Sequence, residues 1–204
     1  MGSRKIKLLM RKTVTLLIIA CLLMSQIPAA SAREGEATLA APFGGTLEEW
    51  DGIDSDFTVS ENELTYLKAV QKPGLLFFCV RGKAIRDNFE FFIDADNDAS
   101  TGMNLSEVWK NGAGIDYKVS GERVYRYENG NWTEAGNATV VKSGTVLEAG
   151  ISLNQLGIDG TNKIKVAFAM EGNNYLPEPA RDMLAVEGAP KTQFAPEVIP
   201  DGDD

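Results

Sequence analysis

The residues best suited to chemistry are the carboxylates of one short acidic segment, residues 93–102, which reads IDADNDASTG. Asp94, Asp96 and Asp98 stand at alternate positions there. Ca²⁺ takes about six to eight hard oxygen ligands, and carboxylate-rich loops provide them. The segment therefore predicts a calcium site, which a carboxylate distant in the sequence would complete: Asp51, Asp54, Asp116 or Asp182. The alternative is a tight turn whose Asp and Asn side chains accept hydrogen bonds from backbone N–H groups.

Aromatic side chains form the second group, because sugar rings stack on flat aromatic surfaces while nearby polar groups bind the hydroxyls. Four residues are candidates for such contacts: Trp109, Tyr127, Trp132 and Tyr175. Trp109 lies in a polar loop where an indole has no core to fill, so we expect it to be exposed. Trp132 follows a hairpin turn, and its alternative role is to pair with Tyr125 or Tyr127 across two strands.

The composition excludes most catalytic classes. The chain has no His, which removes imidazole as a general base, a zinc ligand and a haem ligand. A glycosidase needs two carboxylates that face each other across a cleft, and no spacing in the sequence singles out such a pair. We therefore expect a protein that is not an enzyme.

The segments that must position these residues have the pattern of strands. Short apolar or alternating runs follow one another, with turn signals between them. They predict about eight strands, over residues 64–70, 74–81, 88–94, 115–119, 123–127, 138–142, 146–151 and 163–170. The one helical piece expected is a single turn at residues 153–156. The architecture expected is an all-β antiparallel sandwich of jelly-roll type with Trp50 closing one end, and a closed barrel is the alternative.

The beginning of the chain predicts export. Residues 1–32 combine a basic start, an apolar run and an Ala-x-Ala site, which predicts a bacterial signal peptide cleaved after Ala32. The alternative is a lipid anchor at Cys21, because residues 18–21 resemble a lipobox. We expect a flexible leader over residues 33–46, one domain over 47–190 and an acidic flexible tail over 191–204.

Cleavage would leave a strongly acidic protein. Residues 1–32 hold five basic groups and no acidic one, so their removal changes the formal net charge from −9 to −14. Such a surface repels phosphate backbones, so we expect no nucleic-acid partner. The apolar run at residues 13–24 is too short to cross a bilayer, so we expect no stable membrane span. Cys79 lies in an apolar run and is expected to be buried and unreactive.

Three segments together resemble a known family. WDGIDSDF at residues 50–57, FEFFIDADNDASTG at 89–102 and GAGIDYKVSGERVYRYENGNW at 112–132 look like the type 9 carbohydrate-binding modules and their DOMON-like relatives. The corresponding positions are Asp94, Asp96, Thr101, Gly102, Asp116, Tyr117, Tyr125, Tyr127 and Trp132. The resemblance implies a jelly-roll sandwich, structural Ca²⁺, sugar binding through aromatic side chains and no hydrolytic activity. The expected calcium ligands are therefore Asp94, Asp96, Asp98 and Asp116.

Two functions follow from these observations. The first is a secreted carbohydrate-binding module that contacts cell-wall or other extracellular polysaccharide through exposed aromatic side chains and holds structural calcium. It predicts an exposed pair of Trp side chains beside a polar groove. The alternative is an extracellular surface or matrix protein that binds another protein and no sugar, with scattered aromatic residues.

Overall fold

The computed structural model describes residues 47–53, 56–58 and 63–188. Within these ranges the chain forms twelve strands in two antiparallel sheets, and its one helix is a 3₁₀ turn, η2 at Glu48–Trp50. No helix in the described part of the chain has the length and hydrophobicity that crossing a membrane requires. The predicted signal peptide, leader and tail lie outside the described residues.

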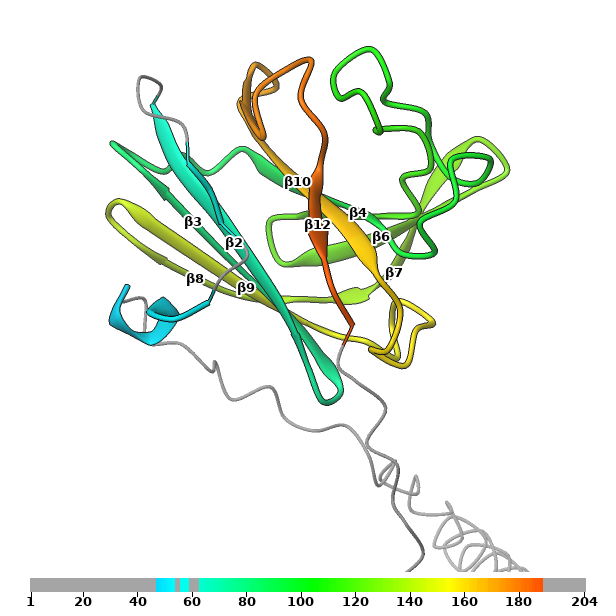
Figure 1. The fold of residues 1–204 in the computed structure, drawn as a ribbon, viewed down its shortest axis with the longest axis horizontal. Helices are drawn as coiled ribbons and strands as arrows, with labels where there is room; N and C mark the ends of the chain where they lie inside the picture. Colours follow the sequence, from blue (N-terminus) through cyan, green and yellow to red (C-terminus); the bar gives the residue numbers. More distant parts are fainter. Residues whose placement is uncertain (1–46, 54–55, 59–62, 189–204) are drawn as a thin grey trace, which may run out of the picture. The chain divides into compact units, whose positions relative to one another are not determined.

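The two sheets form separate layers (Figure 1). The five-stranded sheet has the order β1–β2–β3–β9–β8, with bounds β1 Asp56–Thr58, β2 Leu64–Lys72, β3 Leu75–Gly82, β9 Val146–Ser152 and β8 Thr139–Ser143. The seven-stranded sheet has the order β11–β10–β4–β5–β6–β7, and β12 also pairs with β10. Its bounds are β4 Phe89–Asp94, β5 Tyr117–Ser120, β6 Arg123–Glu128, β7 Asn131–Asn137, β10 Ile164–Met170, β11 Asn174–Leu176 and β12 Leu184–Val186. The predicted antiparallel β-sandwich is confirmed.

Alternation along the strands builds the core between the sheets. On β4, the side chains of Phe89, Phe91 and Ile93 are buried in this core. Phe91 stacks on Phe78 of β3 with 4.7 Å between ring centroids, and it lies 4.9 Å from the ring of Phe168 on β10. Removing aromatic side chains of this size from water contributes strongly to stability. The period of two in the sequence therefore identifies the inner face of β4 correctly.

The outer face of the five-stranded sheet is covered as well. Trp50 of η2 is fully buried against Phe77 and Cys79, which point away from the core on β3. Its Nε1 donates a hydrogen bond to Oε1 of Glu148 on β9 at 2.6 Å. The prediction that Trp50 closes one end of the sandwich is wrong, because the indole lies against a sheet face. The expected burial of Cys79 is confirmed, and burial, reinforced by the charge of Glu148, raises the pKa of its thiol to about 12.

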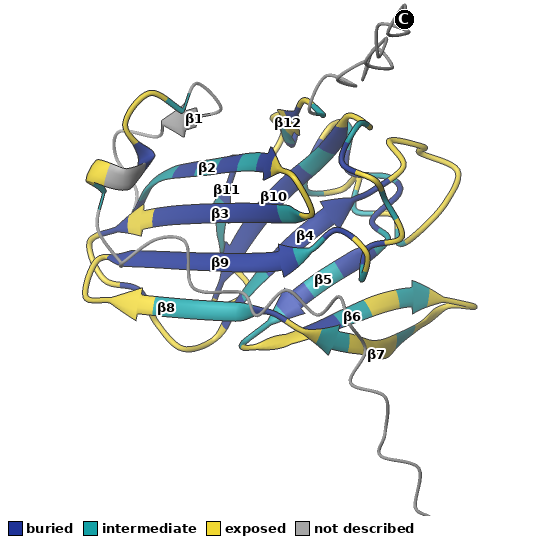
Figure 2. Ribbon diagram, turned by 90° about the horizontal axis from the view of Figure 1, so that it is seen from below, coloured by how far each residue is buried: buried dark blue, intermediate teal, exposed yellow. Residues whose placement is uncertain are grey.

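The outer face of the seven-stranded sheet is covered only in part. The long connection between β4 and β5, residues 95–116, meets residues 177–183 in an apolar cluster over Phe92, Ala167 and Ala169. Backbone hydrogen bonds join the two segments. Beyond this cluster, the hairpin of β6 and β7 carries half-buried and exposed side chains along most of its length (Figure 2). The hairpin of β6 and β7 is therefore the part of this sheet that is most accessible to a ligand or a partner protein.

Four strands go beyond the predicted set: β1, β7, β11 and β12. Three of these strands have three residues each, which is too few to show a period. β7 lies at the edge of its sheet with no buried residue, so no apolar pattern marks it. The single turn expected at 153–156 is present: Leu156 N–H donates to Leu153 O at 3.0 Å, and the turn ends at Gly157, whose φ is positive.

Candidate functional site

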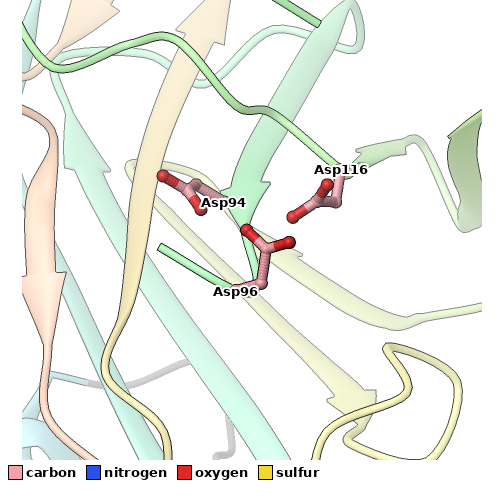
Figure 3. Close-up of side chains that lie close together, drawn as sticks. All are labelled: Asp94, Asp96 and Asp116. Carbon is pink, nitrogen blue, oxygen red and sulfur yellow. The ribbon is translucent and has the colours of Figure 1, made fainter. Parts of the chain in front are cut away.

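Three carboxylates gather where β4 ends and β5 begins. Asp94 is the last residue of β4, Asp96 follows two positions later, and Asp116 immediately precedes β5. Each offers an oxygen within 4.8 Å of the oxygens of the other two (Figure 3). The two strands are antiparallel, and Ile93 pairs with Tyr117. The register of the sheet, rather than spacing along the chain, therefore brings Asp116 to the acidic segment.

Two glycines let the acidic segment pack against the residues before β5. A Cβ at Gly102 would overlap the carbonyl oxygen of Ile115, and a Cβ at Gly114 would overlap that of Asp98. Both glycines also have positive φ angles, 67° and 97°, which other residues rarely adopt. The close approach that positions Asp116 therefore requires both positions to lack a side chain.

The tight turn that was predicted as the alternative to a calcium site is also present. Asp96 Oδ1 accepts a hydrogen bond from Asp98 N at 2.9 Å, and Asp98 Oδ1 accepts one from Ser100 N at 2.8 Å. Asp98 is exposed, and the hydrogen bonds from Ser100 hold the pKa of its carboxyl below the ordinary value. Because this carboxylate is turned toward Ser100, the expected ligand Asp98 is not part of the carboxylate cluster, the name we use for Asp94, Asp96 and Asp116.

Asp94 is the most buried member of the carboxylate cluster, with 0% of its surface exposed. Its Oδ2 lies 3.0 Å from Nζ of Lys165, which stands directly opposite on β10. Its Oδ1 is buried and accepts no hydrogen bond of normal geometry from the described residues. Burial raises the pKa of Asp94, and the Lys165 ammonium offsets part of the rise. A buried carboxylate oxygen without a partner is costly, so a cation beside it would be stabilising.

Asp116 contributes a half-buried carboxylate to the cluster. Its Oδ2 accepts a hydrogen bond from Ala95 N at 2.9 Å. Burial raises its pKa, and the charges of Asp96 and Asp94 add to the rise. With Lys165, the three ionised carboxylates carry a net charge of −2, which a divalent cation would neutralise. Carboxylate oxygens are ligands that Ca²⁺ prefers, so the residues present fit such an ion.

A second group lies on the outer face of β5, β6 and β7. Tyr127 of β6 stands directly opposite Trp132 of β7, and their ring centroids are 5.1 Å apart at an angle of 60°. Tyr125 lies two residues before Tyr127, on the same face of β6. We call Tyr125, Tyr127 and Trp132 the aromatic strip, and each is half-buried. The predicted cross-strand pairing of Trp132 with Tyr127 is confirmed.

Polar side chains flank the aromatic strip. Nζ of Lys118 on β5 lies 5.0 Å from the ring centroid of Trp132 and 5.8 Å from that of Tyr125. It also pairs with Oε1 of Glu90 on β4 at 2.7 Å. Sequence reasoning missed both residues, although each is a charged residue between two buried residues of a strand. That pattern indicates a charge held on the outer face of a sheet.

Trp109 contradicts the expectation that it is exposed. Its indole is 0% exposed and lies 5.8 Å from the ring of Phe92, and its Nε1 donates to the carbonyl oxygen of Pro177 at 2.7 Å. Apolar side chains above the sheet surround it in place of solvent. The missed signal is Phe92 itself, because the consecutive apolar residues Phe91, Phe92 and Ile93 indicate that this part of β4 is covered on both faces. In this position the indole presents no face to a ligand.

Tyr175 lies on β11, and β10, β4 and β5 separate that strand from the hairpin of β6 and β7. Its ring meets Trp109 edge-on at 5.6 Å, and its hydroxyl donates to Gly172 O at 2.6 Å. The four predicted aromatic residues therefore form two ring pairs, and Trp132 and Tyr175 both pack against the apolar cluster that contains Trp109. Only the pair of Tyr127 and Trp132 belongs to the aromatic strip.

The carboxylate cluster and the aromatic strip together are the candidate site. The two groups are neighbours, because the backbone N–H of Tyr127 donates to the carbonyl oxygen of Asp116 at 2.8 Å. One offers hard oxygen ligands around a buried oxygen, and the other offers aromatic rings beside an ion pair. No protein-family model, curated protein or solved structure matches the chain.

Proposed function

We propose that the chain is a secreted, non-catalytic carbohydrate-binding module in which the aromatic strip contacts sugar rings and the carboxylate cluster holds a structural calcium ion. The observation that carries the sugar-binding part is the pair of Tyr127 and Trp132, whose rings meet across two strands and keep part of their surface accessible to solvent. Aromatic rings fixed on a regular sheet lose little side-chain freedom when a sugar stacks on them.

The polar neighbours of the strip supply the other half of sugar recognition. Lys118 and Glu90 form an ion pair beside Trp132, and Arg123 and Glu134 form a second one at the far end of the strip. Because the ion pairs already hold these side chains in place, the side chains lose little further conformational entropy when they hydrogen-bond to sugar hydroxyls. Both pairs are internally neutral, which suits an uncharged polysaccharide.

The proposed calcium ion has a structural role. Bound to the carboxylate cluster, it would join the end of β4 to the start of β5, where Asp116 also accepts the backbone hydrogen bond of Tyr127. It would also give the buried Oδ1 of Asp94 a partner. Support of this kind fixes the strand that carries the aromatic strip.

Retention on insoluble polysaccharides tests the sugar-binding part. The bound fraction is measured on cellulose, xylan, chitin and peptidoglycan for the wild-type protein, Tyr127→Ala and Trp132→Ala. We expect the wild-type protein to bind at least one of them and each variant to lose about tenfold or more in affinity. Thr133→Ala, exposed on the opposite face of the same hairpin, is the matched control and should bind like the wild-type protein. Binding that survives both aromatic substitutions would show that the aromatic strip is not the contact surface.

Thermal unfolding in calcium and in a chelator tests the cation part. We expect Ca²⁺ to raise the Tm of the wild-type protein and to raise it less in Asp96→Asn and Asp116→Asn. Asp98→Asn changes a carboxylate of the same loop that lies outside the cluster, so it should keep the full calcium effect. An equal shift in all four proteins would mean that calcium acts elsewhere.

A second candidate function is an extracellular structural or protein-interaction domain that binds no sugar. The hairpin of β6 and β7 favours it, because β7 is an edge strand with exposed residues on both faces, and such edges can pair with a strand of another protein. A correctly folded wild-type protein that is retained by no polysaccharide in the test above would favour this candidate.

A further inference from the structure

Lys165 is a charged residue of β10 to which the proposed function gives no role. Its side chain is only 15% exposed, and its Nζ lies 3.0 Å from Oδ2 of Asp94. The described part of the chain pairs no other basic side chain with the carboxylate cluster. A lysine is rarely held so far from water unless its charge has a partner.

The two oxygens of Asp94 have different surroundings. Oδ2 faces Lys165 on the neighbouring strand, whereas Oδ1 accepts no hydrogen bond of normal geometry from the described residues, although the backbone N–H of Asn97 is near enough to the carboxylate to lower its pKa. Figure 3 shows one oxygen of Asp94 directed toward Asp96 and Asp116, and the other directed away from them. A carboxylate held at one oxygen cannot rotate freely, so Lys165 keeps the other oxygen available to a cation.

Lys165 also sets the charge that a cation meets. Without its ammonium, the three ionised carboxylates would carry −3, and with it they carry −2. A fixed positive charge repels a bound cation in proportion to the charge of that cation. It therefore penalises a trivalent ion half as much again as a divalent ion at the same place.

We propose that Lys165 is a positioning residue of the cation site, which holds Asp94 in the binding orientation and makes the carboxylate cluster prefer divalent over trivalent cations. This inference rests on the cation part of the proposed function. It is independent of whether the aromatic strip binds sugar.

Calorimetric titration with CaCl₂ and with TbCl₃ tests the inference, because Tb³⁺ is close to Ca²⁺ in size and differs in charge. The measured quantity is the ratio of the two dissociation constants. Lys165→Met should shift this ratio toward Tb³⁺ by about tenfold relative to the wild-type protein. Lys165→Arg keeps the charge and should keep the ratio within about threefold of the wild-type value.

Two further variants separate this effect from a structural one. Lys165→Gln keeps a hydrogen-bond donor for Asp94 without the charge, so it should shift the ratio toward Tb³⁺ as Lys165→Met is expected to. It replaces Lys165→Met in the test if that variant does not fold. Lys163→Met removes the same charge from an exposed side chain that pairs with Glu187, away from the carboxylate cluster. It should leave the ratio unchanged, which excludes a general effect of net charge.

Each other outcome overturns the inference in a distinguishable way. An unchanged ratio in the folded Lys165→Met and Lys165→Gln variants would mean that Lys165 does not set the preference. Cation binding by Lys165→Met but not by the wild-type protein would mean that Lys165 takes the place of the cation. If neither protein binds a cation, the cation part of the proposed function fails together with the inference, while retention on polysaccharide still reports on the aromatic strip.

Discussion

Trp109 and Trp132 lie on the outer side of the same sheet and have polar neighbours along the chain, yet Trp109 is buried and Trp132 is half-exposed. Beneath Trp109, β4 and β10 present apolar side chains such as Phe92 and Ala167. Trp132 is only partly buried against the same cluster, and beside it β5 and β6 present Lys118 and tyrosine rings. The sheet under an indole, rather than its neighbours in sequence, therefore decides whether the indole is covered.

The connections that carry the two residues differ as well. Residues 95–116 are a long connection that can fold over the sheet and pack against residues 177–183, and Trp109 lies within it. Trp132 is the second residue of β7, immediately after a tight turn with Asn129 and Gly130 at positive φ. A hairpin of this kind leaves no spare chain to cover the rings. Trp109 is consequently a packing residue and Trp132 a surface residue.

The largest expected effect comes from removing the buried indole. Trp109→Ala leaves a cavity over β4 and leaves the carbonyl of Pro177 without its donor, so we expect a loss of about 3–5 kcal/mol in the free energy of unfolding. Urea unfolding followed by circular dichroism measures it. Trp109→Phe restores most of the packing but not the hydrogen bond, so it should recover part of the loss. A loss below about 1 kcal/mol for Trp109→Ala would contradict the structural role.

A smaller loss of stability is expected from replacing Gly114, which lets the connection that contains Trp109 pack closely. Gly114→Ala forces a Cβ against the carbonyl oxygen of Asp98 at a positive φ, and we expect a loss of about 2 kcal/mol or more. Because Asp116 follows two residues later, the Tm shift in calcium should shrink too. Gly121→Ala is the control, since it has a positive φ with nothing within 4 Å, and it should cost less and keep the calcium shift.

Removing the surface indole should change stability least. Trp132→Ala loses a cross-strand pair with Tyr127 on a partly exposed face, so we expect a change of about 1 kcal/mol. Its fluorescence is the sharper readout, because Trp132 is the one described tryptophan that solvent reaches. Acrylamide should quench the wild-type protein, and Trp132→Phe should lose most of the quenchable fraction. Strong quenching that persists in Trp132→Phe would show that Trp50 or Trp109 is accessible.

The difference between the two indoles also explains how much of the fold could be predicted from the sequence alone. The inner faces were predictable, because Phe89, Phe91 and Ile93 alternate and a core needs such a stripe. The covering of the outer faces was not, since it depends on which distant loop folds over which strand. Trp109 and Trp50 both fall in this class, and both are buried against outer faces.

The candidate site divides in the same way. The acidic segment was predictable from the alternate spacing of Asp94, Asp96 and Asp98, but that spacing does not separate the two cluster members from Asp98, which caps a turn. Lys165 was not predictable, because its place beside Asp94 follows from the register of two strands far apart in the chain. Contacts set by register need the paired strands to be known first.

The third tryptophan, Trp50, lies on the five-stranded sheet, and there we expect almost no alkylation of the thiol that it covers. Trp50 covers Cys79, and burial raises the pKa of this thiol to about 12, so near pH 8 it is protonated and should not react with iodoacetamide in the folded protein. The folded-state pKa lies above the unfolded value of about 8.5, so the contribution of the neutral thiol to stability is complete below that pH and is lost as the pH rises toward 12. Mass spectrometry of the peptide that contains Cys79 measures the labelling, with protein unfolded in urea as the positive control. Trp50→Ala should make Cys79 reactive, whereas Trp132→Ala should not. Rapid labelling of the folded wild-type protein would mean that the cover over this face opens easily, and that Trp50 is closer in behaviour to Trp132 than to Trp109.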